Sequence, residues 1–462
     1  MKKIVMILFM SVLVLIIGYI AAYRITNQAP SDQLTLNRQV SKVLETGGCM
    51  MCHTPSAHLP FYASWPIADK LISQDVKMGM DAFDMTYLGL CLKNNELRPN
   101  EVDIAKLENV AQNATMPPIQ YAAVHLGASL VPDEANALLA WTKRNRIVYY
   151  TSPLTSKDMM NEPLQPITYV KVDTAKVELG EDLFNDLRLS ADSTISCASC
   201  HGLKTGGVDN KQYSEGIRGQ KGGINAPSVY NAYFNFVQFW DGRALTLAQQ
   251  AAGPPLNPVE MGCESFAEII ERLEADKEFS SRFKAVYPEG ITELTITDAI
   301  AEYEKTLITP SRFDAYLRGD SCALTASEIQ GYELFKKFDC AICHVGKNIG
   351  GQSYEKFSLQ GDYYSDRTHR VSDATLNVED NGRYKQTGLD YDKNRFKVPS
   401  LRNVALTYPY MHDGTIQNLS EAVSKMVLYQ TVKKIRFSDT DKIVIFLHAL
   451  TGDSIATKNP AE

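Results

Sequence analysis

Three copies of one five-residue pattern, Cys-x-x-Cys-His, constrain the fold of this 462-residue chain more than any other feature. They occur at Cys49–His53, Cys197–His201 and Cys340–His344. In a c-type haem attachment site, two cysteines form thioethers and the histidine ligates the iron. A zinc site would need further ligands nearby, and a disulfide framework would not place histidine after every pair. The sequence therefore predicts three covalently bound haems c. The residues that hold them are Cys49, Cys52, His53, Cys197, Cys200, His201, Cys340, Cys343 and His344.

An uncharged apolar run at residues 4–23 follows Lys2 and Lys3 and ends before Arg24. About 20 apolar residues span the ~30 Å core of a bilayer, and this run exceeds the apolar region of a typical cleavable signal. We therefore expect residues 1–24 to form an uncleaved, single-pass anchor in a bacterial inner membrane. The two lysines would lie in the cytoplasm and the haem domains in the periplasm. A long cleaved signal is the alternative, and it would also export the chain.

Helical patterns recur along the chain, and no alternating strand pattern is evident. Two haem patterns, within residues 179–201 and 330–344, follow the same Gly-x-x-Leu-Phe motif, which is a weak internal repeat. The sequence predicts a mainly α protein, with three c-type cytochrome-like haem domains after a transmembrane helix. The predicted divisions are the anchor at 1–24, a monohaem cytochrome c domain at 25–160, a second haem domain at 161–325 and a third at 326–462.

Charge and the remaining cysteines add two limits. The net charge of -7 gives no reason to expect nucleic acid as a partner, because nucleic-acid binding requires a basic face. Cys91, Cys263 and Cys322 lie outside the haem patterns. In an oxidising compartment two of them could pair, whereas buried small apolar side chains are the simpler interpretation for at least one.

The sixth ligand of each iron has to come from elsewhere in the chain. For the haem at His53 we favour Met116, because Pro117 and Pro118 would stiffen its loop. The other candidates there are His58, Met78, Met80, Met85 and His125. For the haem at His344 the candidates are His369, Met411, His412 and Met426. Residues 202–260 contain no His, Met or Cys, so the haem at His201 is predicted to have an open sixth position. Open haem iron is where oxygen and peroxide chemistry occurs.

From about Asn161 to the C-terminus the chain resembles the bacterial di-haem cytochrome c peroxidases. The resemblance lies in RLSADSTISCASCHGLKTGGVD, INAPSVYN, FWDGRA, GPPLNPVEM and VPSLRNVALTYPYMHDG. The extra N-terminal haem segment and the anchor make it similar to the trihaem quinol peroxidases within that family. The resemblance implies a peroxidase that reduces hydrogen peroxide to water with electrons from membrane ubiquinol or menaquinol. The haem at His201 would be peroxidatic, and electrons would reach it from the haem at His53 through the haem at His344.

The same resemblance implies roles for individual residues. Trp240 would bridge the two C-terminal haems for electron transfer, Glu260 would move the peroxide proton, and Gln250 would orient the peroxide. Met426, fourteen residues beyond His412, would be the sixth ligand of the haem at His344. A calcium ion would be held by Asn225, Thr407 and Pro409, through oxygen ligands that suit a hard cation.

One position departs from the family pattern. Typical members carry a histidine sixteen residues after the peroxidatic haem's own histidine, and it leaves the iron only after the other haem is reduced. Here that position is Ile217, which cannot bind iron. The expected consequence is a peroxidatic haem that is always open.

Three other functions stay open on the sequence. The peroxidase could take electrons from a soluble cytochrome, or the chain could be a trihaem electron carrier without enzymatic activity. It could also resemble a relative that oxidises tyrosine or tryptophan on a partner protein, although that relative has tyrosine where this chain has Met426. The sequence leaves a homodimer open.

Overall fold

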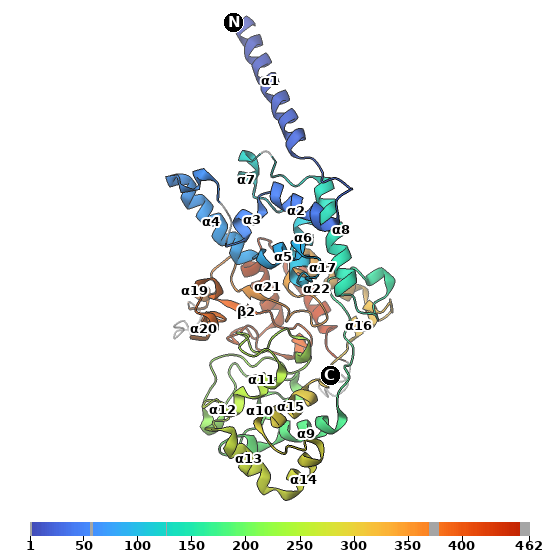
Figure 1. Ribbon diagram of the computed structural model, residues 1–462, viewed down its shortest axis with the longest axis vertical. Coiled ribbons are helices and arrows are strands. Elements are labelled where there is room, and N and C mark those ends of the chain that lie inside the picture. Colours follow the sequence, from blue (N-terminus) through green and yellow to red (C-terminus); the bar gives the residue numbers. More distant parts are fainter. Residues whose placement is uncertain (1, 56–58, 126, 369–377, 453–462) are drawn as a thin grey trace. The chain divides into compact units, whose positions relative to one another are not determined.

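The computed structural model describes residues 2–55, 59–125, 127–368 and 378–452, and it is mainly helical, as predicted (Figure 1). The chain forms two compact units, Met1–Tyr150 and Thr151–Glu462. The first contains one Cys-x-x-Cys-His pattern and the second contains two.

Helix α1, Lys2–Thr26, carries the apolar run of the N-terminal unit. Its segment Phe9–Thr26 has a mean hydropathy of 1.8, and it is long and apolar enough to cross a membrane. Most of the described side chains of this segment are exposed, with values such as 67% for Phe9 and 72% for Leu15. The helix thus has the length and composition predicted for residues 1–24.

The remainder of the N-terminal unit is a small helical fold around one apolar core. Its elements are α2 (Leu36–Thr46), α3 (Cys49–His53), η1 (Phe61–Ser64), α4 (Pro66–Ala82), α5 (Thr86–Lys93), α6 (Glu101–Asn113), α7 (Ile119–Val124) and α8 (Pro132–Tyr149). Helix α8 packs against α2 and α6. Trp141 of α8 is buried in this core, and its indole N–H donates to Asn37 Oδ1 of α2 at 2.7 Å. This contact positions α2, which leads directly into the first haem pattern.

The C-terminal unit repeats one arrangement twice. Its first part comprises α9 (Thr174–Asn185), α10 (Cys197–Cys200), α11 (Leu247–Ala251), α12 (Gly253–Leu256), α13 (Phe266–Ala275), α14 (Lys277–Val286) and α15 (Glu293–Glu304). Its second part comprises α16 (Arg312–Leu317), α17 (Ala326–Lys337), α18 (Cys340–Cys343), α19 (Tyr363–Thr368), α20 (Tyr384–Thr387), α21 (Leu419–Gln430) and α22 (Phe437–His448). In each part a helix before the haem pattern crosses a later helix, α9 with α15 and α17 with α22.

The glycines of the Gly-x-x-Leu-Phe motif explain both crossings. A Cβ on Gly180 would lie 2.0 Å from the carbonyl oxygen of Ala299, and a Cβ on Gly331 would lie 2.0 Å from that of Lys442. Only glycine permits so close an approach of two backbones. The weak sequence repeat therefore marks the contact point of a helix pair beside each of these two haem patterns.

The two largest apolar cores in the described part of the C-terminal unit lie one in each of its parts. One lies among α9 and α13–α15, and the other among α16, α17, α21 and α22. The second core also contains Leu164 and Phe313, which come from chain segments before residue 325. A short antiparallel pair, β1 (Tyr354–Lys356) and β2 (Arg395–Lys397), lies beside this core, with Tyr354 opposite Lys397.

A buried ion pair joins four segments of this unit. Arg402 donates to Asp314 through both terminal nitrogens, at 2.8 and 2.9 Å, and both side chains are fully buried. Asp314 also accepts from the backbone N–H of Ile167 at 2.8 Å, and Arg402 Nε donates to the Lys347 carbonyl at 2.6 Å. Burial alone would raise the pKa of Asp314, but the charge and hydrogen bonds of Arg402 lower it below its ordinary value.

We expect Asp314→Asn to destabilise the C-terminal unit strongly, because it would leave the Arg402 charge buried without its partner. Breaking a buried pair in this way costs about 3–5 kcal/mol. The matched control is Asp182→Asn, which removes the half-exposed partner of Arg282 and should cost no more than about 1 kcal/mol. Urea unfolding of the haem-loaded protein measures both. Equal midpoints for the two variants would contradict the role assigned to Asp314.

Candidate functional site

The three haem patterns share one local geometry. Each lies on a short helix, α3, α10 or α18, and each histidine ring lies against a backbone carbonyl through Nδ1. The acceptors are the carbonyls of Phe83 for His53 (2.7 Å), Gly207 for His201 (3.3 Å) and Ile349 for His344 (3.3 Å). A carbonyl can only accept, so Nδ1 carries the proton and Nε2 is left to bind a metal.

The protonation of these rings also suits iron binding. Burial lowers the pKa of His53 and His201, and it lowers the pKa of His344 to about 4. Each imidazole is therefore neutral, the form that ligates a metal. The six cysteines of the three patterns belong to the described part of the chain, and no disulfide joins them there, so their sulfurs can form haem thioethers. The donor set thus fits three c-type haems.

The first centre is closely packed. A Cβ on Gly79 of α4 would lie 2.5 Å from the Cys52 carbonyl oxygen, and one on Gly48 would lie 2.3 Å from the Tyr121 hydroxyl oxygen. Met116 lies half-buried in the loop between α6 and α7. His125, another candidate sixth ligand, has Nε2 2.7 Å from the Tyr62 hydroxyl. Of the remaining candidates, Met78 is 54% exposed, Met85 is buried, Met80 is half-buried, and His58 lies outside the described residues.

The predicted peroxide-handling pair lies on one segment. Gln250 is half-buried on α11, and Glu260 lies in the turn that follows α12. Burial raises the pKa of Glu260, while the charge of Arg243 and a hydrogen bond from Asn257 oppose that rise. A carboxylate with a raised pKa can both accept and return a proton near neutral pH.

Asn257 organises the turn that carries Glu260. Its side-chain amide donates to Glu260 Oε1 at 2.7 Å, and its side-chain oxygen accepts from the Val259 N–H at 3.0 Å. The Asn257 carbonyl also accepts from the Gly262 N–H at 2.9 Å. Asn257 and Arg243 were not predicted as site residues, although they fall within the stretches GPPLNPVEM and FWDGRA. The signal was the Asn-Pro pair, which is typical of a turn.

Ile217 packs directly against this turn. Its side chain is buried, and its backbone N–H donates to the Glu260 carbonyl at 2.9 Å. A Cβ on Gly262 would lie 2.2 Å from Ile217 Cδ1, so only glycine fits beside the isoleucine. Gln220 adds a side-chain hydrogen bond to the Pro258 carbonyl at 2.9 Å. The loop around Ile217 is therefore fixed to the loop that carries Glu260.

Trp240 connects the two haem-bearing parts of the C-terminal unit. Its indole N–H donates to the Asn225 carbonyl at 2.8 Å, and its own carbonyl accepts from the Lys397 N–H at 2.8 Å. The indole ring meets Phe396 and His412 edge to face, with centroids 6.2 and 6.4 Å apart. Such contacts hold the ring in one orientation.

The three residues predicted for calcium come from two segments that the structure holds together. The N–H of Asn225 donates to the His412 carbonyl at 2.8 Å, and Asn210 donates to the carbonyls of Leu406 and Tyr408. Those carbonyls flank Thr407, and Pro409 follows Tyr408. The Asn225 side-chain N–H₂ is turned to the carbonyls of Lys211 and Gln212. Any cation here would meet amide and carbonyl oxygens, which are ligands that calcium accepts.

The candidates for the third centre differ in their surroundings. His412 Nε2 lies 2.8 Å from Asp380 Oδ1, and both are buried, so this nitrogen already has a partner. Arg367 joins Asp380 to Asp413 through ion pairs of 2.7 and 2.6 Å. Met426 lies half-buried on α21, and Met411 has a left-handed backbone with φ of 72°. His369 lies outside the described residues.

The three remaining cysteines have different environments, and no disulfide joins them within the described chain. Cys91 and Cys263 are buried, and Cys322 is exposed. Cys263 Sγ donates to the Leu189 carbonyl at 3.4 Å and accepts from Arg272 at 3.1 Å.

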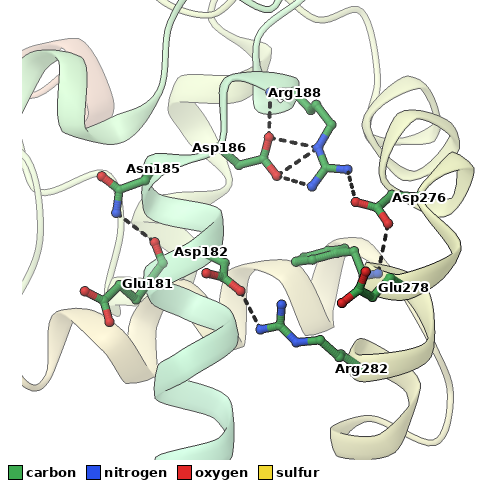
Figure 2. A pocket seen from close by; sticks show the side chains of 9 residues that line it. Glu181, Asp182, Asn185, Asp186, Arg188, Asp276, Glu278 and Arg282 are labelled. Carbon is green, nitrogen blue, oxygen red and sulfur yellow. Dashed lines mark hydrogen bonds and ion pairs between the residues drawn. The ribbon is translucent and has the colours of Figure 1, made fainter.

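A surface pocket of about 630 Å³ lies between α9 and α14, and none of the predicted site residues lines it (Figure 2). Its two arginines form ion pairs with three of its aspartates. Arg188 binds Asp186 at 2.6 Å and Asp276 at 3.2 Å, and Arg282 binds Asp182 at 2.6 Å. The ion pairs along this pocket connect α9 and the residues that follow it to α14.

Comparison with known proteins gives matches to both units. The di-haem cytochrome c peroxidase family model matches residues 174–322, and a haem-binding domain model matches residues 12–144. The chain is 47% identical over 418 residues to cytochrome c peroxidase Ccp of Escherichia coli strain K12, covering 90% of this chain and 88% of that protein. It is 46% identical over 306 residues to cytochrome c551 peroxidase of Nitrosomonas europaea, and this match covers 65% of this chain and 87% of that protein.

A solved structure shares the fold of the C-terminal part. The crystal structure of a MauG-like protein associated with microbial copper homeostasis superposes with a TM-score of 0.54 at 27% sequence identity. The match covers 63% of this chain and 95% of that protein.

We expect Gly216→Ala to lower peroxide turnover, because its Cβ would lie 2.1 Å from the Val259 carbonyl oxygen and 2.6 Å from that of Glu260. The two loops would have to separate. Displacing a catalytic group by about 1 Å can cost about 100-fold, so we expect a fall of about 10- to 100-fold. Gly222→Ala is the control, because its Cβ would make ordinary contacts with the carbonyl oxygens of Ser214 and Ile224, at 3.7 and 4.0 Å. Stopped-flow peroxide consumption at equal haem content tests this, and unchanged turnover in Gly216→Ala would refute it.

Proposed function

The chain belongs to the di-haem cytochrome c peroxidase family and is a peroxidase of hydrogen peroxide, and we propose that it is a membrane-anchored, three-haem enzyme that takes its electrons from membrane quinol. One observation carries the proposal. A single chain joins an apolar helix of membrane-spanning length, an additional Cys-x-x-Cys-His unit and the peroxidase unit. This arrangement supports electron entry at the membrane and peroxide reduction in the C-terminal unit.

The proposed reaction balances without another reactant. Oxidation of one quinol to quinone releases two electrons and two protons. Reduction of one hydrogen peroxide to two water molecules consumes the same number of each. The haem irons, when bound, supply the redox chemistry, and the protein residues handle binding and protons.

The residues around Glu260 support the peroxidatic role of the site at His201. Glu260 would take the proton from one peroxide oxygen and return it to the leaving oxygen. Asn257 holds the carboxylate through its 2.7 Å hydrogen bond, and burial raises the Glu260 pKa so that the proton can move in both directions. Gln250 would donate a hydrogen bond that orients the peroxide.

Ile217 supports a site that needs no reductive opening. Its side chain is apolar and buried against Gly262, and so it offers no ligand atom to a metal. Met426 and Met116 would ligate the irons at His344 and His53, and Trp240 would carry electrons between the two C-terminal haems. A calcium ion held by Asn225, Thr407 and Pro409 would fix the segments beside Trp240.

A soluble cytochrome is the second candidate donor. The relatives from Nitrosomonas europaea and Pseudomonas aeruginosa are named cytochrome c551 peroxidases, and they match about 65% and 61% of this chain. Residues 12–144, which match the haem-binding domain, favour quinol because they join the additional haem unit to the apolar helix.

We expect the full-length protein in detergent to oxidise a water-soluble quinol analogue with one equivalent of hydrogen peroxide. Cys49→Ser/Cys52→Ser removes the first haem attachment and should abolish quinol oxidation. The variant should retain peroxide consumption when a small chemical reductant feeds the C-terminal unit. Absorbance of the quinone product measures the reaction. If the wild-type protein oxidises reduced cytochrome c551 and no quinol, the soluble donor is correct and the quinol proposal is wrong.

We expect ferric wild-type protein to show a high-spin haem that reacts with peroxide without prior reduction. Ile217→His should convert that haem to a low-spin form and create a need for pre-reduction, because an imidazole would then compete for the iron. Ile217→Leu is the control and should keep the wild-type spectrum. Electron paramagnetic resonance and stopped-flow absorbance provide the two measurements. A wild-type ferric protein without a high-spin signal would contradict the open site.

A further inference from the structure

The surface of η1 and α4 in the N-terminal unit carries an unusual concentration of exposed apolar side chains. We define the η1–α4 surface by Phe61, Trp65, Ile67, Leu71 and Met78. Phe61 is 83% exposed and Ile67 is 81% exposed, and the other three are each more than half exposed. Large apolar side chains gathered on one surface mark a site of interaction, whereas single ones do not.

Helix geometry places three of these residues on one stripe of α4. At about 100° per residue, Ile67, Leu71 and Met78 lie within about 40° of one another around the helix axis. The exposed residues Lys70 and Lys77 lie together along one side of this stripe, and the exposed Asp75 lies along the other side. An apolar stripe with lysines along its margin is typical of a helix that lies in a membrane interface.

Aromatic side chains form a cluster of their own just before α4. Phe61 and Trp65 meet edge to face with centroids 5.9 Å apart, and Tyr62 lies 6.4 Å from Trp65. Tryptophan and tyrosine are enriched where a membrane meets water, because one end of each ring system is apolar and the other is polar.

The η1–α4 surface is linked to the end of the candidate membrane span. The Tyr62 hydroxyl lies 2.7 Å from His125 Nε2, and the His125 carbonyl accepts from the Ala128 N–H at 2.9 Å. A Cβ on the intervening Gly127 would lie 3.5 Å from Cβ of Thr26, the last residue of α1. Thr26, where α1 ends, is therefore linked to Tyr62 through two contacts: one between Thr26 and Gly127, and one between His125 and Tyr62.

The same residues lead inward to the first haem pattern. His125 stacks on Tyr121 with centroids 3.9 Å apart. The Tyr121 hydroxyl oxygen would lie 2.3 Å from a Cβ on Gly48, the residue before Cys49. A surface that contacted lipid here would bring the first haem pattern within a few side chains of the membrane.

We propose that the η1–α4 surface docks on the lipid bilayer that α1 spans, so that the N-terminal unit lies on the membrane interface instead of hanging from a tether. The proposal rests on the membrane anchoring given under the proposed function. Lipid is the occupant that explains the aromatic residues, the lysine-flanked stripe and the link to Thr26 together. It also places the entry point for quinol at the level where quinol head groups lie.

The test uses full-length, haem-loaded protein in liposomes with about one quarter anionic lipid. A nitroxide is attached at Ile67→Cys in a Cys322→Ser background, which removes the exposed free thiol. Collision with oxygen, which concentrates in lipid, is compared with collision with a water-soluble nickel chelate. The reference is a nitroxide at Leu294→Cys on α15, which is 79% exposed in the C-terminal unit.

We expect the label at position 67 to favour oxygen and the label at 294 to favour the nickel chelate. Equal preference for the nickel chelate at both positions would overturn the proposal. Shielding of position 67 from both reagents would also overturn it, because the occupant would then be protein, either the C-terminal unit or a second copy. Loss of the shielding on dilution to one protein per liposome would identify the second copy.

A second readout separates docking from the choice of donor. Ile67→Glu/Leu71→Glu should lower the rate with a long-chain quinol embedded in the liposome by at least threefold and leave the rate with a water-soluble quinol unchanged. Leu294→Glu is the matched control and should change neither rate. If the wild-type protein oxidises no quinol at all, the donor proposal fails, while the label at position 67 still decides whether the surface meets lipid. Equal rates for the double variant and the wild-type protein with embedded quinol would contradict docking.

Discussion

The ion pair between Arg402 and Asp314 is the constraint on which the C-terminal unit depends. Two opposite charges without exposure to water are stable only when their polar atoms have partners. Here the backbone of Ile167 and Lys347, together with Ser311 and the Gln165 carbonyl, supplies the remaining bonds. These bonds fix the segment that runs from Lys347 to Ile349. The Ile349 carbonyl accepts from His344 and from the Leu401 N–H, so the orientation of the haem ligand follows from the position of Arg402. The neighbouring Asn403 donates to Thr309, which accepts also from Asn231 of the preceding haem segment. The buried pair thus holds the segment that positions His344, and through Asn403 and Thr309 this segment is connected to Asn231 near the other haem pattern.

The two C-terminal haem sites have the same backbone arrangement, and they differ in a few side chains. Both have a helix pair that crosses at a glycine, and both have a histidine that donates from Nδ1 to a carbonyl. Burial raises the pKa of Cys197 and Cys200, and the charge of Glu260 raises the pKa of both further, so the turn that carries Glu260 lies close to the haem pattern at His201. Ile217 and Asn257, which are hydrogen-bonded to Glu260, add an apolar side chain and an amide beside this carboxylate. In the second part of the C-terminal unit, His412 is hydrogen-bonded to Asp380, and Met426 lies half-buried on α21. The same fold can therefore present one site suited to peroxide and another suited to electron transfer.

The sequence predicted the features that depend on residues close together in the chain. The haem patterns, the apolar helix and the Gly-x-x-Leu-Phe repeat are all local, and the repeat marks real helix crossings. Long-range pairings were not predictable, because their partners follow no spacing rule. Arg402 lies 88 residues from Asp314, and His412 lies 32 residues from Asp380. Asn257 was missed for another reason: its side chain bonds within three residues, but only the fold shows that the bonded carboxylate is Glu260. The ligands, base and calcium residues assigned by resemblance stay predictions that rest on the family.

The two units differ in the surfaces that they offer, and this difference bears on how a peroxidase of this kind works. Hydrogen peroxide is small and polar. In the proposed mechanism, the partly buried carboxylate of Glu260, whose pKa is raised by burial, would move the peroxide proton. The reductant that we propose, a quinol, is large and apolar and stays in the lipid, so the protein would have to reach the membrane to use it. The N-terminal unit has both means to do so: an apolar helix that ends at Thr26 and an exposed η1–α4 surface linked to it through Gly127, His125 and Tyr62. From that surface, stacked rings lead to the first haem pattern within the same unit. Under the proposed function, separating the apolar reductant from the polar oxidant in this way would leave each site with the solvent environment that its own substrate requires, and the haems would pass only electrons between them.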